Sequence, residues 1–195
     1  MSSTWKLIHG LNLMLGGLCL VGGSAMYFRK LIGIYDLAHS TGGWLLSIGS
    51  SFLLIGDIQE WINNNRKYRL VSEQHQFRCS MEIISLFSAC GSANYVLGSI
   101  LLIPSFDKYV LYGNYLILIG STIIFISSII KINRNHSMVD LFSCFGALGY
   151  FSGVTLLIPY FVINSFRLNL SASLCVFGGF CFFISSLFLQ YSYFY

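Results

Sequence analysis

Six apolar runs, each about 20 residues long, constrain the fold of this chain more than any other feature. A helix of about 20 apolar residues is long enough to cross the hydrocarbon core of a bilayer. Inside lipid, every backbone polar group needs a partner within the protein, and a helix provides those partners within its own segment. We therefore expect six membrane-spanning helices, at about residues 7–28, 43–61, 83–103, 109–130, 139–158 and 170–191.

The low charge of the chain supports the same conclusion. Charged residues make up 9% of the 195 residues and hydrophobic residues 55%, whereas soluble domains carry roughly 25% charged residues. A soluble chain of this length has too much surface for its volume to bury so many apolar residues. The formal net charge of +4 lies mostly outside the apolar runs, as is usual for loops near lipid headgroups, and indicates no nucleic-acid partner. The predicted class is an all-α, multi-pass integral membrane protein.

Three segments of the chain repeat one pattern of glycine, serine and apolar residues. They align without gaps, and they cover residues 42–61, 113–132 and 171–190. The spans before the second and third segments also match each other at one constant offset, over residues 87–106 and 142–161. The unit is a helical hairpin, and an even number of spans per unit gives the copies the same orientation. We predict hairpins at residues 1–66, 82–135 and 136–195. We interpret the polar connector at 67–81 as a linker, with a short amphipathic helix on the membrane surface as the alternative.

Nine glycines recur at matched places in these spans. In lipid, helices associate where small residues let two backbones approach closely. Glycines seven residues apart return to nearly the same helix face, because two turns take about seven residues. We predict that these glycines pack helix on helix, with a pore-lining role as the alternative: Gly16, Gly23, Gly49, Gly91, Gly98, Gly120, Gly146, Gly153 and Gly178.

The spans also contain a motif, which we call the Gly-Ser phrase. It consists of an aromatic residue followed by Gly-Ser, then a short loop, then a second Gly-Ser. In the second hairpin its residues are Tyr95, Gly98, Ser99, Pro104, Gly113, Gly120 and Ser121. The phrase resembles the YrhK-like domain, a two-span membrane module that would cover nearly the whole chain as three copies. The first copy has Arg29 where the proline would fall, and the third has Gly179 in place of the second serine. The resemblance implies the hairpin architecture and no catalytic residues.

Acidic residues near the span ends are the candidates for a polar site, because an ionisable residue inside a membrane suggests a function. Asp57 is the deepest, and the repeat aligns it with Ser128 and Ser186. The other acids are Glu60, Glu82 and Asp140. We expect all four to reach water or to pair with arginines of the adjoining loops: Arg66, Arg78 and Arg134. Lys131 is interpreted as part of a polar break between the fourth and fifth spans.

The sequence contains no recognisable catalytic constellation. Neither a nucleophile–base pair nor a phosphate loop occurs, and the six cysteines show no metal-ligand spacing. His9 is the one histidine that we place within a span, so a bis-histidine haem would lack its second ligand. We predict no enzymatic activity, no catalytic residue, no cofactor and no metal site.

Two functions remain open at this stage. The leading expectation is a non-catalytic accessory subunit of a large membrane complex, with a mitochondrial inner-membrane respiratory or ATP-synthase assembly as the expected setting. The absence of a catalytic pattern, the small extramembrane mass and the 17 Phe and 12 Tyr residues favour it. Its partners would be other membrane subunits and lipids, among them anionic lipids such as cardiolipin.

The alternative is a small transporter or channel for a neutral solute or lipid. Its signature would be polar residues from several spans that converge at mid-depth, and the mid-span polar residues are mainly serines, with Asn12 and Asn94. A third possibility is a quinone- or haem-binding anchor of a redox enzyme. The N-terminus and the connections between hairpins carry more Lys and Arg than the loops within hairpins, which favours both termini on the more negative side of the membrane. The sequence leaves open whether the hairpins form a compact bundle or an arc around a partner.

Overall fold

The computed structural model of the protein describes residues 3–35, 37–69, 75–158 and 164–194, and their side chains except for residues 3, 66–69, 75–80 and 135. The described residues form helices joined by short turns, and no strand occurs among them. Six of the helices are long and apolar enough to cross a membrane, which confirms the predicted all-α, six-span class. In order, the elements are α1 (Ser3–Ala25), α2 (Arg29–Ile34), α3 (Ala38–Arg69), α4 (His75–Leu101), η1 (Pro104–Tyr109), α5 (Val110–Asn135), α6 (Met138–Thr155) and α7 (Ser165–Phe194).

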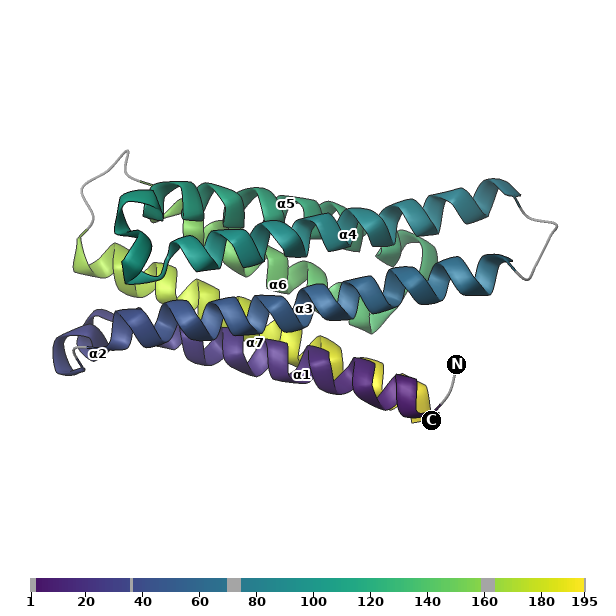
Figure 1. The fold of residues 1–195 in the computed structure, drawn as a ribbon, viewed down its shortest axis with the longest axis horizontal. Coiled ribbons are helices and arrows are strands. Elements are labelled where there is room, and N and C mark those ends of the chain that lie inside the picture. The colour runs from purple at the N-terminus through teal and green to yellow at the C-terminus, as the bar shows by residue number, and fades with distance from the viewer. Residues whose placement is uncertain (1–2, 36, 70–74, 159–163, 195) are drawn as a thin grey trace.

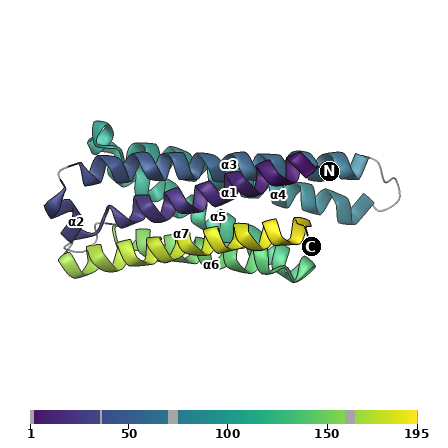
Figure 2. The same ribbon diagram turned by 90° about the horizontal axis from the view of Figure 1, so that it is seen from below.

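The six long helices lie side by side in a closed ring (Figure 1, Figure 2). Each packs on the long helix before it and the one after it, and α7 returns to pack on α1. The sequence does not distinguish a compact bundle from an arc around a partner. The contact between α7 and α1 shows that the six helices form a closed bundle. Both termini lie at one end of the ring, which we call the terminal end; α2 and η1 lie at the other, the hairpin end (Figure 1).

The predicted glycines lie at close contacts between neighbouring helices. Three matched pairs meet backbone to backbone: Gly16 with Gly49, Gly91 with Gly120, and Gly146 with Gly178. A Cβ atom added at Gly120, for example, would lie 2.7 Å from the carbonyl oxygen of Gly91. The remaining glycines of the set, Gly23, Gly98 and Gly153, leave a Cβ only 2.8–2.9 Å from backbone atoms of the next helix. The repeated hairpin itself stays a prediction, because α3 packs on α4 as extensively as on α1.

Several boundaries differ from those predicted. Helix α3 continues to Arg69 and α4 begins at His75, so most of the predicted linker at 67–81 is helical. These two helices extend past the others at the terminal end (Figure 1). Loss of hydrophobicity marks where a helix leaves the bilayer, but a polar segment can stay helical in water. At the hairpin end α1 stops at Ala25, and the short α2 fills part of the predicted loop. Pro104 begins η1, whereas Pro159 lies outside the described residues.

Four buried residues form a barrier across the middle of the ring, which we call the septum: Leu20, Tyr95, Tyr150 and Phe182. The rings of Tyr95 and Tyr150 meet edge to face, with centroids 5.4 Å apart. The Tyr150 and Phe182 rings stack at 6.2 Å. The hydroxyl groups of Tyr150 and Ser24 share a hydrogen bond of 2.9 Å, which satisfies the polar tip of the tyrosine. Aromatic packing therefore fills the centre of the ring.

Candidate functional site

Two cavities in the part of the chain that the structure describes, each partly open to the outside, lie one on each side of the septum. The polar chamber, of about 410 Å³, lies toward the terminal end and takes side chains from all six long helices, including His9, Asp57, Glu60, Ser92, Lys131 and Asp140. The apolar chamber, of about 500 Å³, lies toward the hairpin end and includes Tyr27, Asn114, Ile117, Val154 and Cys175. The ionisable residues gather in the polar chamber, which makes it the candidate site.

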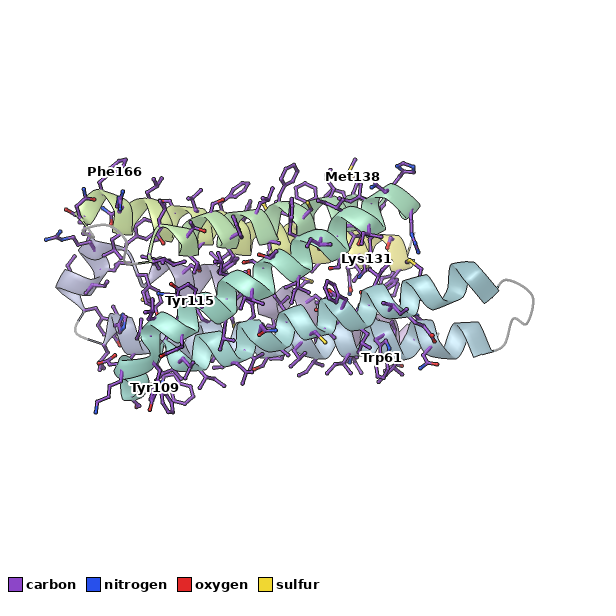
Figure 3. The ribbon with its side chains drawn as sticks, turned by 90° about the horizontal axis from the view of Figure 1, so that it is seen from above. Trp61, Tyr109, Tyr115, Lys131, Met138 and Phe166 are labelled. Carbon is purple, nitrogen blue, oxygen red and sulfur yellow. The ribbon has the colours of Figure 1, made fainter. Side chains whose placement is uncertain are left out.

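An ion pair joins α3 to α5 across the polar chamber. The Lys131 Nζ atom donates to both carboxylate oxygens of Glu60, at 2.8 and 2.9 Å. The Lys131 side chain is 9% exposed, and the Glu60 side chain is 33% exposed because it borders the cavity. Figure 3 shows Lys131 toward the terminal end of α5, whereas Met138 and Phe166 point to the outer surface of the ring. The pair therefore lies inside the bundle rather than at its surface.

Asp57 lies one turn before Glu60 on α3 and projects into the same chamber. Its carboxylate accepts hydrogen bonds from two serines of α4, at 3.3 Å from the Ser88 hydroxyl and at closer range from the Ser92 hydroxyl. The serines are four residues apart and so share one face of α4. Two neutral hydroxyl groups fix the carboxylate in place but leave its charge without a cation in direct contact among the described side chains.

Aromatic residues close the chamber where α1 meets α7. The imidazole of His9 stacks on the indole of Trp5 at 4.9 Å, and Tyr193 lies 6.1 Å from the same imidazole. The Nδ1 atom of His9 lies 3.1 Å from Oε1 of Gln59, which can only accept, so Nδ1 carries the hydrogen. Lys6 donates to the backbone oxygen of Tyr193 at 3.1 Å. Gln59 and the two aromatic rings thereby hold the His9 imidazole at the edge of the chamber.

The α6–α7 side of the chamber carries Asp140 and a hydroxyl cluster. Asp140 lies in the first turn of α6, where the helix dipole favours a negative charge. The Ser143 and Ser185 hydroxyl groups are 2.9 Å apart, and Ser185 donates to the carbonyl oxygen of Val139. Counted together, the chamber holds three carboxyl groups and one ammonium group, so Asp57 and Asp140 remain in excess once Glu60 pairs with Lys131.

The structure corrects the partners predicted for the acids. The described hydrogen bonds of Asp57 come from serines, and the ion partner of Glu60 is Lys131 rather than a loop arginine. The side chains of Arg66 and Arg78 lie outside the described residues. Lys131 does not belong to a polar break, because α5 continues to Asn135 and leaves it one turn inside the helix. One signal in the sequence points to the pair: the repeat aligns Glu60 with Lys131, three residues beyond Asp57 and Ser128.

The described residues contain no group of three or more His, Cys, Asp or Glu side chains placed to hold a metal ion. No known protein family matches the chain, and no curated protein or solved structure proves significantly similar to it. The resemblance to the YrhK-like domain therefore stays a prediction from the sequence.

Proposed function

We propose that the protein is a small membrane carrier that binds a cationic solute in the polar chamber. One observation carries this proposal: charged side chains from α3, α5 and α6 converge inside a ring of membrane-spanning helices. A scaffold gains little from such groups, because replacing a buried ion pair by apolar residues is often neutral or stabilising. Ionisable residues within a membrane commonly mark the path of an ion or a substrate.

The balance of charge selects the class of solute. The pair of Glu60 with Lys131 is neutral as a unit, so Asp57 and Asp140 give the chamber a net negative charge. This shifts the expected solute from the neutral molecule considered from the sequence to a cation. A cavity of about 410 Å³ is within the range of small-molecule sites. We assign recognition of the cation to Asp57, with Ser88 and Ser92 as the residues that orient its carboxylate.

The septum supports a carrier over an open channel. It separates the polar chamber from the hairpin end with packed aromatic rings, of which Tyr95 is 2% exposed and Tyr150 3%. A solute in the polar chamber can leave toward the hairpin end only if the helices rearrange around the septum. Alternation between two such states is how secondary transporters expose one site to each side of the membrane in turn.

Uptake into liposomes tests the proposal. Purified protein is reconstituted, a negative-inside potential is imposed with potassium and valinomycin, and the uptake of radiolabelled methylammonium, choline and sodium is followed. We expect uptake of at least one of these cations, reduced at least tenfold by Asp57→Asn. Glu82→Gln is the matched control, because it removes a carboxylate of α4 that does not line the chamber. Uptake equal to that of empty liposomes for all three cations would overturn the carrier proposal.

The accessory-subunit hypothesis predicts a different result. In a mild-detergent native gel of source membranes, a subunit would migrate with a large assembly whose other members mass spectrometry can name. Migration with such an assembly together with no cation uptake would favour the subunit. A respiratory or ATP-synthase partner in that assembly would support the mitochondrial inner membrane as its location. Migration near the monomer mass would favour the carrier.

A further inference from the structure

The apolar chamber is a second cavity with features of its own. Its volume is about 500 Å³, and it lies on the opposite side of the septum from the polar chamber. Side chains such as Leu46, Ile117, Val154 and Leu157 form most of its wall. Ser171 and Ala172 also line the chamber, and their small side chains leave space inside it. Both residues are buried, so this space lies within the bundle.

Two polar groups in this wall lack hydrogen-bond partners. The Oδ1 atom of Asn114 and the hydroxyl group of Tyr27 are buried, and neither bonds to another described residue. Asn114 is 6% exposed, so bulk water does not reach it freely. Buried polar atoms in proteins are nearly always hydrogen-bonded, and an exception calls for a partner that occupies the site.

The other polar groups nearby are already satisfied. Ser24 bonds to Tyr150 at 2.9 Å, and Ser171 donates to the carbonyl oxygen of Gly153 at 2.7 Å. The Tyr27 phenol is neutral near pH 7 and is able to donate. The charged residues that border the chamber, Asp107 and Lys108, belong to the exposed η1 at its mouth. His39 is half-buried and also borders the chamber, and its imidazole meets the Tyr27 ring edge to face at 5.1 Å. Apart from this imidazole and the two η1 residues at the mouth, the described wall offers hydrogen bonds and apolar surface without charge.

We propose that the apolar chamber binds an uncharged amphiphile, an aliphatic chain that ends in a single hydroxyl group. The hydroxyl group donates to Asn114 Oδ1, with Tyr27 as a second polar contact, and the chain packs against the leucine, isoleucine and valine wall. A charged head is disfavoured, because apart from Asp107 and Lys108 at the mouth the described wall holds no carboxylate or ammonium group to offset its desolvation. A plain alkane is disfavoured too, since it leaves Asn114 unpaired. This site does not depend on carrier activity.

Photolabelling of the purified protein tests the site. The probe is a hexadecanol that carries a diazirine in its chain, and labelled peptides are mapped by mass spectrometry. We expect saturable labelling of residues that line the apolar chamber, displaced by unlabelled 1-hexadecanol and much less by hexadecane or hexadecanoate. Labelling spread evenly over the lipid-facing surface, or equal displacement by all three competitors, would overturn the proposal. That second result would also indicate that a trapped water satisfies Asn114.

Matched variants identify the groups responsible. Asn114→Leu keeps the size of the side chain and should weaken the displacement constant of hexadecanol about three- to tenfold, as the loss of one hydrogen bond predicts. Asn94→Leu is the control, because Asn94 bonds within its own helix and lines neither chamber. Ala172→Phe should abolish labelling by filling the cavity, and Leu168→Trp fills it from a partly exposed wall in case the first variant fails to fold. Unchanged labelling in a folded filling variant would refute the site.

Discussion

The pair of Glu60 and Lys131 shows at the residue scale how much a single buried charge depends on its partner. Replacing Lys131 by Met leaves the Glu60 carboxylate in the chamber without its cation. We expect Lys131→Met to lower the free energy of unfolding by about 3 kcal/mol, the lower end for a broken buried pair, because a third of the Glu60 side chain is accessible. Thermal and denaturant unfolding in detergent measure this change.

The double variant distinguishes charge from packing. In Glu60→Met with Lys131→Met, no charge is left unpaired, and we expect most of the lost stability to return. A single variant as stable as the double variant would show that water in the chamber screens the charge completely. Cation uptake by the double variant is a separate measurement. It tests the binding site rather than stability, because the double variant keeps Asp57 and the two serines that orient its carboxylate.

The same pair shows what residue-level reasoning from sequence could reach. Asp57 was recognised as the deepest acid, but its partners come from α4, and only the packing of α3 on α4 brings Ser88 and Ser92 to it. Lys131 was misplaced because a lysine after an apolar run usually marks the membrane surface. The aligned positions of Glu60 and Lys131 carried the information, but alignment alone does not say that the two side chains face the same interior.

Helix contacts at the element scale depend on glycine because no larger residue fits between the backbones. A Cβ atom at Gly120 would lie 2.7 Å from both the Gly91 oxygen and a ring carbon of Tyr95. We expect Gly120→Val to destabilise the protein by about 1–3 kcal/mol, as overpacking of a closely packed interior does. Unfolding by SDS titration measures the loss. Gly33→Ala is the control: a Cβ there meets nothing within 4 Å, so the variant should be neutral or slightly stabilising.

Equal stability of the two glycine variants would contradict this account of α4 and α5. At this scale the sequence was most informative, because hydrophobic length and glycine spacing are local properties. It predicted the six spans and the faces that pack. It missed α2, because six residues are too short to be recognised as a span. It missed the polar ends of α3 and α4, because a helix that has left the bilayer no longer carries an apolar signal.

At the scale of the whole molecule, the distribution of polarity is opposite to that of a soluble bundle, which has a polar surface and an apolar interior. Many exposed positions along the spans are apolar, such as Leu97 at 55% and Phe180 at 52%, whereas Asp57, Glu60, Lys131 and Asp140 line an interior cavity. The two chambers differ in character because their linings differ: acids and serines toward the terminal end, small and aliphatic residues toward the hairpin end. The side chains at these inward-facing positions decide what each chamber can bind.

Both chambers depend on the closure of the ring between α1 and α7, which sequence reasoning left undecided. A Cβ atom at Gly17 would lie 2.9 Å from the Cβ of Phe183, so these positions are close enough for a disulfide after a small adjustment. In a variant whose native cysteines are replaced by alanine, Gly17→Cys with Phe183→Cys should form an intramolecular cross-link on mild oxidation. Cleavage in the α3–α4 connection followed by electrophoresis detects the link, since the two fragments then migrate together until reduced. The pair Gly33→Cys with Phe183→Cys places one cysteine in α2 at the hairpin end and the other near the middle of α7, so it should stay unlinked. Absence of the first link in membranes would mean that α7 does not pack on α1, and an open arc would leave the polar chamber without the wall that His9 and Tyr193 provide.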